Sequence, residues 1–140
     1  MKNLLAITII LIGLNAVKAQ RTGTLKVKVT NLESTEGVVK VGVYDSETNY
    51  MINTCFSKEV IIESKESVEV SFDNVPFGKY AISVYHDSNG NNELDSNFLG
   101  IPSEDYAFSN NADGRFGPPD YEKCVFELNS HEVIQTIKIN

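Results

Sequence analysis

Hydrophobic and polar residues alternate along most of the chain with a period of two. The alternation is clearest over residues 24–30, where Leu25, Val27 and Val29 share one side of the pattern. Successive side chains of a β-strand lie on opposite faces of a sheet, so this pattern predicts strands with one buried face. It predicts seven strands, at residues 24–30, 38–44, 58–63, 68–73, 80–85, 122–128 and 133–139.

Turn-forming residues separate these strands, and residues 20–140 show no helical periodicity. Short strands at this spacing are typical of a β-sandwich, with a closed β-barrel as the alternative. Pro76 and Gly78 predict a type II turn in which Gly78 has positive φ. We therefore expect a single all-β domain over residues 20–140, large enough to bury a core.

Residues 1–19 have the pattern of a secretory signal peptide. Lys2 precedes an apolar run over residues 4–14, and small residues precede an expected cleavage point at Gln20. A membrane anchor is the alternative, but the run is shorter than the ~20 residues that span a bilayer. Residues 20–140 have no second apolar run. We therefore expect a secreted or periplasmic chain with no membrane span.

The predicted mature chain is strongly acidic. Without Lys2 and Lys18, 10 basic residues stand against 19 acidic ones, which gives a net charge of −9. This charge argues against nucleic acid and anionic membranes as partners, and it permits cations. Most of the charge lies in residues 80–122, where Arg115 is the only basic residue against eight acidic ones. We expect Arg115 to pair with one of these carboxylates or with loop carbonyls, and the alternative is that it binds an anionic substrate.

Residues 86–119 predict one long, ordered loop. Oxygen-bearing side chains recur there at alternate positions: Asp87, Asn89, Asn91, Glu93 and Asp95. Ca²⁺ takes about six to eight oxygen ligands, and a curled loop that aims alternate residues at one centre supplies them. The sequence therefore predicts a Ca²⁺ site with Asp87 and Asp95 as charged ligands, the two asparagines as neutral ligands and Glu93 as a backbone ligand.

The spacing matches the first half of an EF-hand loop and then departs from it. Asn92 occupies the sixth position, where Gly is usual, and Asn tolerates the left-handed conformation well. The twelfth position is Phe98 rather than a bidentate Glu. A further carboxylate would come from Glu104, Asp105, Asp113 or Asp120. The alternative is an ordinary polar turn without metal, because tight turns use the same residue types.

The second half of the loop is too apolar for a solvated tail. Its large apolar residues are Phe98, Leu99, Ile101, Tyr106, Phe108 and Phe116. We expect residues 98–119 to pack over one end of the sandwich and to form the surface that meets a protein or carbohydrate partner at the cell envelope. A sugar-stacking platform is the alternative role for the aromatic residues.

Cys55 and Cys124 either pair or remain free thiols, and the sequence leaves both open. No nucleophile motif or zinc-ligand spacing is present, so we expect a binding or accessory module rather than an enzyme. The alternatives are a hydrolase-like enzyme that uses His86 with Asp87 or Glu104, and a purely structural envelope protein.

Three segments resemble a single bacterial family: GTLKVKVTNL, VPFGKYAISVYHD and HDSNGNNELDSNFLGIPSEDYAFSNNADGRFGPP. They resemble domain of unknown function 2141 (DUF2141) over nearly all of residues 22–140. The family loop reads H-D-x-N-G-N-G-x-x-D-x-N, and Asn92 stands where its last Gly is usual. The resemblance implies a secreted or periplasmic, immunoglobulin-like or transthyretin-like β-sandwich with no established activity, and it supplies no catalytic residues.

Overall fold

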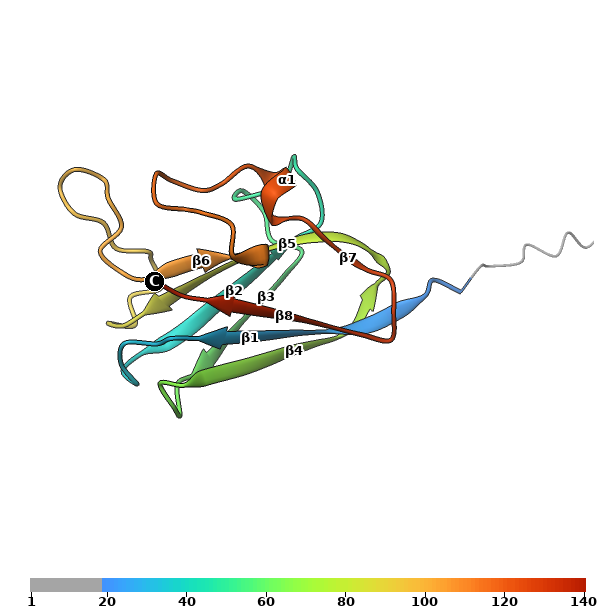
Figure 1. Cartoon of the computed structure of the whole chain (residues 1–140), viewed down its shortest axis with the longest axis horizontal. Coiled ribbons are helices and arrows are strands. Elements are labelled where there is room, and N and C mark those ends of the chain that lie inside the picture. Colours follow the sequence, from blue (N-terminus) through green and yellow to red (C-terminus); the bar gives the residue numbers. More distant parts are fainter. Residues whose placement is uncertain (1–18) are drawn as a thin grey trace, which may run out of the picture.

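The computed structural model of the protein describes residues 19–140, and the rest of the predicted signal peptide lies outside this part. Eight strands form two sheets (Figure 1). They are β1 (Thr22–Thr30), β2 (Val38–Tyr44), β3 (Phe56–Ile61), β4 (Ser67–Pro76), β5 (Gly78–Asp87), β6 (Tyr106–Phe108), β7 (Phe126–Leu128) and β8 (Glu132–Lys138). Two short helical turns, η1 (Ser109–Asn111) and α1 (Tyr121–Cys124), lie between β6 and β7.

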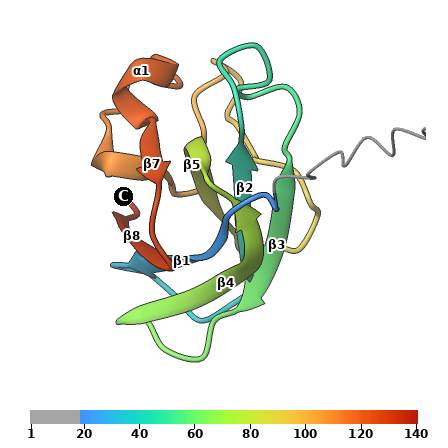
Figure 2. The same ribbon diagram turned by 90° about the vertical axis from the view of Figure 1, so that its right-hand side faces the viewer.

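The two sheets pack as a sandwich. The smaller sheet has the strand order β4-β1-β8, and the larger has β3-β2-β5-β6, with β7 paired to β5. The β1–β8 pair is parallel and the other pairs are antiparallel. Figure 2 shows the two sheets facing each other across the core. In the described part of the chain no strand ladder joins the two sheets, so the sandwich prediction is confirmed over the barrel.

The core consists of the side chains that the alternation predicted. Leu25, Val27 and Val29 of β1 are fully buried. On β2, Val39 and Val43 are also fully buried, and they belong to the same apolar cluster. Burying each such side chain stabilises the fold by roughly 1.5–3 kcal/mol, so both strands contribute to the stability of the core.

The segment after the long loop differs from the prediction of one strand over residues 122–128. The helical turn α1 occupies its first half, and only β7 pairs with β5. The turn buries Cys124 in a small cluster with Ala81 and Phe108. Ser109 fixes this arrangement, because its Oγ accepts the Ile82 N–H at 2.9 Å and donates to the Cys124 carbonyl at 2.5 Å.

The connection between β4 and β5 also differs from its prediction. Pro76 ends β4 and Gly78 begins β5, so the chain crosses there from one sheet to the other. Gly78 does not have positive φ, and the left-handed residue is Asn74, with φ 56°. The two cysteines are free thiols: Cys55 is exposed and Cys124 is buried. The alternative of a disulfide therefore does not hold in the structure.

The apolar residues of the long loop divide into two groups. Tyr106 and Phe108 pack against each other edge to face, as expected for residues that cover the sandwich. Phe98, Leu99 and Phe116 are exposed, so the expectation that they pack over its end is wrong. Across residues 19–140 no helix is long and apolar enough to cross a membrane.

Candidate metal centre

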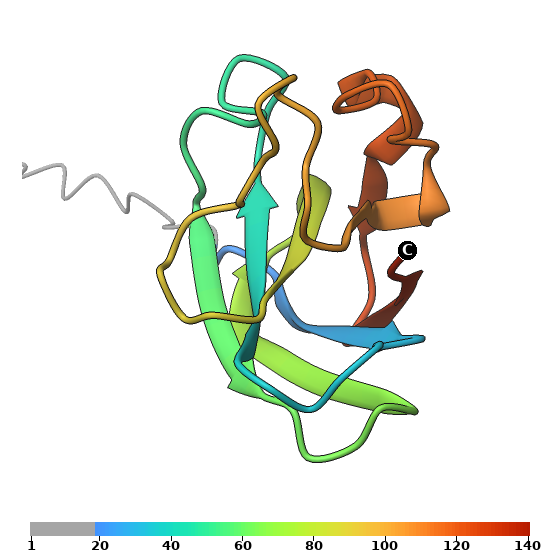
Figure 3. The same ribbon diagram turned by 90° about the vertical axis from the view of Figure 1, so that its left-hand side faces the viewer.

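The candidate site begins where β5 ends, at Asp87, whose side chain is fully buried. Its Oδ1 accepts the N–H groups of Gly90 at 2.8 Å and Asn91 at 3.1 Å, and its Oδ2 accepts the Asn92 N–H at 2.9 Å. Figure 3 shows the connection to β6 running in front of the strand ends from this point. Asp87 therefore curls the chain into a tight loop around its own carboxylate.

Two residues of this tight loop adopt the left-handed backbone conformation. Gly90 has φ 72° and Asn92 has φ 67°. The prediction that Asn92 takes the conformation usual for Gly is confirmed. A neighbouring turn packs against the loop at Gly37, where an added Cβ would lie 2.0 Å from the Asp87 carbonyl oxygen. Only glycine fits there, so the two loops are in close contact.

Asp95 closes the loop from its other end. Its Oδ2 accepts a hydrogen bond from Asn89 Nδ2 at 2.6 Å, and its Oδ1 accepts one from Asn91 Nδ2 at 2.9 Å. The Oδ1 atoms of the two asparagines accept the N–H groups of Asn91 and Glu93. The structure thus joins the side chains of Asn89, Asn91 and Asp95, and Glu93, the predicted backbone ligand, takes part through its N–H.

Glu104 braces both ends of the loop. Its side chain is buried, and its Oε1 accepts the Ser88 N–H at 3.0 Å and the Ser88 hydroxyl at 3.1 Å. Its Oε2 accepts the Asp95 N–H at 3.1 Å. The Ser103 N–H donates to the Asp95 carbonyl at 2.8 Å, which ties the two arms of the connection together. Glu104 is therefore the candidate carboxylate that the fold brings to the loop.

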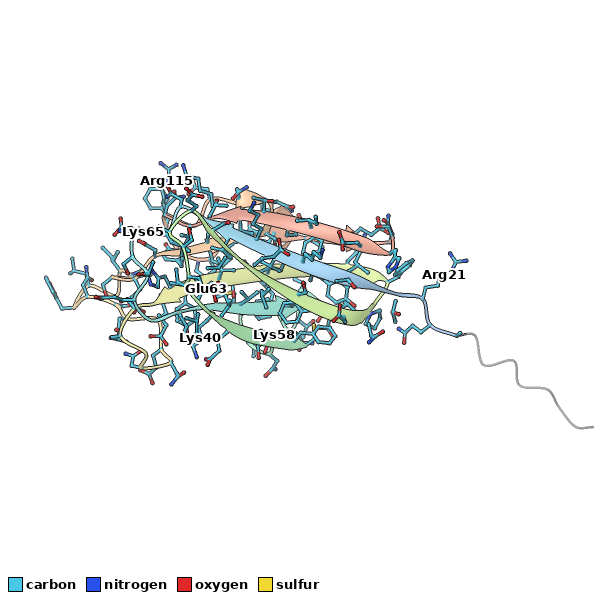
Figure 4. All side chains as sticks on the ribbon, turned by 90° about the horizontal axis from the view of Figure 1, so that it is seen from below. Arg21, Lys40, Lys58, Glu63, Lys65 and Arg115 are labelled. Atoms are coloured by element: carbon cyan, nitrogen blue, oxygen red, sulfur yellow. The ribbon has the colours of Figure 1, made fainter. Side chains whose placement is uncertain are left out.

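Two other candidate carboxylates form ion pairs of their own. Asp113 pairs with Arg115 at 2.7 Å, and Asp120 pairs with Lys123 at 3.2 Å. The expected pairing of Arg115 is thus confirmed. Hydrogen bonds from the Arg115 guanidinium lower the pKa of Asp113 to about 2. Figure 4 shows Arg115 and Lys40 on opposite sides of the molecule.

The contact between Lys40 and the loop was not predicted from the sequence. From β2, its Nζ donates to Asn92 Oδ1 at 2.5 Å and to Glu59 Oε2 at 2.6 Å. The alternation places Lys40 on the outer face of its strand, but the loop lies 52 positions further along the chain. No local pattern links the two, because β2 and β5 become neighbours only in the folded sheet.

His86 is buried beside the loop. Its ring Nε2 lies 2.7 Å from the Glu36 carbonyl oxygen, and its backbone N–H donates to the Asp105 carbonyl at 2.9 Å. The ring therefore joins β5 to the turn that precedes β2. Asp105 takes part through its backbone carbonyl oxygen, which accepts the His86 N–H, and not through its carboxylate.

The atoms of this loop that could bind a metal ion are oxygen atoms of carboxylates and amides. Within residues 19–140 no group of three or more His, Cys, Asp or Glu side chains is placed to hold a metal ion. Within the loop, Asp87 accepts backbone N–H groups, including that of Asn91, and Asp95 accepts the side-chain amides of Asn89 and Asn91. Carboxylate and amide oxygens suit a hard cation such as Ca²⁺ better than a metal that prefers imidazole or thiolate.

The fold and the loop define a small β-sandwich with one hydrogen-bonded acidic loop after its fifth strand. Over residues 27–136 the chain matches the family described as "Uncharacterized protein conserved in bacteria (DUF2141)", and it belongs to this family. The family resemblance of the sequence is thereby confirmed. Searches of curated proteins and of solved structures gave no match.

Proposed function

We propose that the protein is a non-catalytic binding or accessory module of the cell envelope that holds Ca²⁺ in residues 87–95. The observation that supports this most is the convergence of Asn89 and Asn91 on the carboxylate of Asp95. These three side chains and Asp87 are the predicted side-chain ligands, and Glu93 is the predicted backbone ligand. Two carboxylates and two side-chain amides within residues 87–95 suit a hard cation such as Ca²⁺.

Asp87 retains capacity for a ligand. A carboxylate offers about four acceptor positions, and three of them are used by backbone N–H groups. Ca²⁺ would take the remaining position and replace the two amide bonds to Asp95. Glu104 would act one layer further out, because its oxygens hold the backbone at both ends of the loop.

The burial of the candidate acid–base groups favours a module without catalysis. The side chains of His86, Asp87 and Glu104 are all buried. The His86 ring nitrogen and both Asp87 oxygens already make hydrogen bonds within the fold. A general base must reach the proton that it removes from a substrate, and these contacts oppose such access.

A titration with CaCl₂, followed in ¹⁵N–¹H spectra of residues 20–140, tests the proposal. The expected dissociation constant lies in the extracellular range of roughly 10⁻⁴–10⁻³ M, because only two ligands carry charge. Shifts should concentrate in the amides of residues 87–95. Asp95→Asn should abolish them, and the exposed Asp120→Asn should leave them intact. Equal shifts in both variants, or none at saturating CaCl₂, would refute the calcium site.

Export is a separate part of the proposal. The signal-peptide pattern of residues 1–19 implies a mature chain that begins at Gln20. Mass spectrometry of the protein collected outside the cytoplasm should give the mass of residues 20–140. A protein that is recovered only with residues 1–19 attached would contradict an exported module.

A further inference from the structure

A groove crosses the outer face of the larger sheet, over the centre of β2. Its volume is about 500 Å³, which lies in the range of small-molecule sites, roughly 300–1,000 Å³. Its lining includes Gly42 and Tyr44 of β2, Ser57 of β3, and Ser83 and Tyr85 of β5. We call it the Gly42 groove. It is separate from the acidic loop, because none of residues 87–95 lines it.

The register of the strands creates this hollow. Gly42 lies opposite Ser57 on one side and Ser83 on the other, so a missing side chain and two short ones share a row. Opposite residues on one face of paired strands lie close together, so the absent side chain leaves open space between its neighbours. A Cβ added at Gly42 would lie 2.9 Å from Thr54 Cγ2. Glycine inside a strand often marks a place where a ligand approaches the backbone closely.

Two hydroxyl groups border the open space. The position of the added Cβ lies 3.4 Å from both Ser83 Oγ and Tyr44 Oη, and these two oxygens are hydrogen-bonded at 3.1 Å. Tyr44 is only 6% exposed, and its ring packs edge to face against Tyr50, which holds the hydroxyl in position. The bond between the oxygens uses one of their two protons, so the other proton is available to a ligand.

The neighbouring row supplies polar groups without net charge. Lys40 lies between Glu59 and Tyr85, and its Nζ pairs with the Glu59 carboxylate at 2.6 Å. The second lysine of the lining, Lys58, donates from its Nζ to the Ser71 carbonyl of the smaller sheet. Lys40 and Glu59 therefore cancel each other's charge at the groove, while the Tyr85 ring adds apolar surface.

The chemistry of the groove indicates the class of ligand. A sugar has hydroxyl groups at its rim and an apolar face of C–H groups, which match the two hydroxyls and the tyrosine ring. An anionic ligand would be repelled by the net charge of −9 in residues 20–140 and would find Lys40 already paired. A peptide that adds to a sheet as a strand needs a free edge, whereas β2 is already paired to both β3 and β5.

We propose that the Gly42 groove binds a neutral saccharide. The hydroxyls of Tyr44 and Ser83 and the Lys40–Glu59 pair would bond to the sugar hydroxyls, and the Tyr85 ring would cover an apolar face of the sugar. This inference rests on the proposed role as a binding module and names the class of ligand, but it does not depend on calcium, because the groove lies outside the acidic loop.

Spectra of ¹⁵N-labelled residues 20–140 in EDTA test the proposal, with cellobiose, maltose, chitobiose and N-acetyllactosamine as probes at millimolar concentrations. At least one disaccharide should shift the amides of Gly42, Ser57 and Ser83. No shift with any of the four would overturn the proposal. Shifts that require Ca²⁺ and are confined to residues 87–95 would also overturn it, because the sugar would then lie on the calcium loop. A failure in EDTA leaves the calcium titration unaffected, so the two proposals fail separately.

Variants of the outer sheet face locate the site. Ser57 is exposed on β3, so Ser57→Phe should fill the groove without disturbing the core and weaken binding at least tenfold. Tyr85→Ala should weaken it about tenfold, because the stacking surface is lost. Ile61→Phe is the matched control: it places a ring on the same face of β3, at a residue that is 72% exposed and outside the groove. Unchanged affinity in both groove variants, or equal losses in all three, would overturn the proposal.

Discussion

At the scale of single residues, Asp87 organises the acidic loop. Its carboxylate is removed from water and bonds to three consecutive backbone N–H groups, those of Gly90, Asn91 and Asn92. A buried carboxylate must be hydrogen-bonded, and hydrogen bonds to a charged group contribute roughly 1.5–3 kcal/mol each. Asp87 is therefore important to stability whether or not a cation is bound.

Asp87→Ala should lower the free energy of unfolding by roughly 2–4 kcal/mol, because three backbone N–H groups lose the same charged acceptor together. Urea unfolding in EDTA measures the change without any contribution from metal. Asp73→Ala is the control: Asp73 is exposed on β4 and accepts one side-chain bond from Thr24. If the two variants unfold at the same urea concentration, the role assigned to Asp87 is wrong.

The Asp113–Arg115 pair makes a prediction about pH. The pKa of Asp113 is lowered to about 2 by hydrogen bonds from Arg115, and Arg115→Gln should return it toward the ordinary value of about 3.9. Because the folded-state pKa is the lower one, the pair stabilises the fold above about pH 4 and loses this effect as the pH falls toward 2. Carboxyl ¹³C shifts recorded against pH measure both values. An unchanged Asp113 pKa in the variant would contradict the pairing.

At the scale of elements, a single hydroxyl joins β5 to α1. Ser109 is fully buried, and its Oγ bonds to the backbone of Ile82 on one side and of Cys124 on the other. Ser109→Ala would leave a buried N–H and a buried carbonyl without this partner. We expect a loss of roughly 2–3 kcal/mol in the free energy of unfolding, measured in urea, against no significant change for Ser57→Ala on the exposed face of β3. Equal stability of both variants would contradict this role.

The period-two pattern was enough to predict most of the sandwich. It placed six of the eight strands and the buried faces of β1 and β2, because these strands are long and have one face in water. It missed β6, which has only three residues and pairs with β5 at a distance in sequence. It assigned residues 122–128 to one strand, because a single helical turn is too short to show a period.

The acidic loop was predictable as a set of residues but not as an arrangement. The alternate oxygen-bearing residues were visible in the sequence, and Glu104 was one of four carboxylates with equal standing. Glu104 reaches the loop, rather than one of the other three, because the chain after residue 95 returns and places its side chain beside Ser88. The contact of Lys40 with Asn92 depends on the pairing of β2 with β5. Exposure of Phe98, Leu99 and Ile101 is likewise a result of the turn at Asn97 and not of composition.

At the scale of the whole molecule, the proposed calcium site lies at one end of the sandwich. The β5–β6 connection contains both the acidic loop of residues 87–95 and the exposed apolar turn of residues 97–101, whereas the N-terminal segment leaves at the other end (Figure 1). If residues 1–19 are removed on export, the free end of the chain therefore lies away from the proposed calcium site.

Thermal unfolding of residues 20–140, stripped of metal and measured in millimolar CaCl₂ and in EDTA, tests the calcium site most directly. A ligand that binds only the folded state stabilises it by RT ln(1 + [L]/Kd), about 1.4–2.7 kcal/mol at roughly 10–100 times Kd. The account predicts a rise in Tm of roughly 5–10 °C with Ca²⁺, a smaller rise with Mg²⁺ and none in Asp95→Asn. The same Tm in CaCl₂ and EDTA would contradict it, and residues 87–95 would then be a turn held by its own hydrogen bonds.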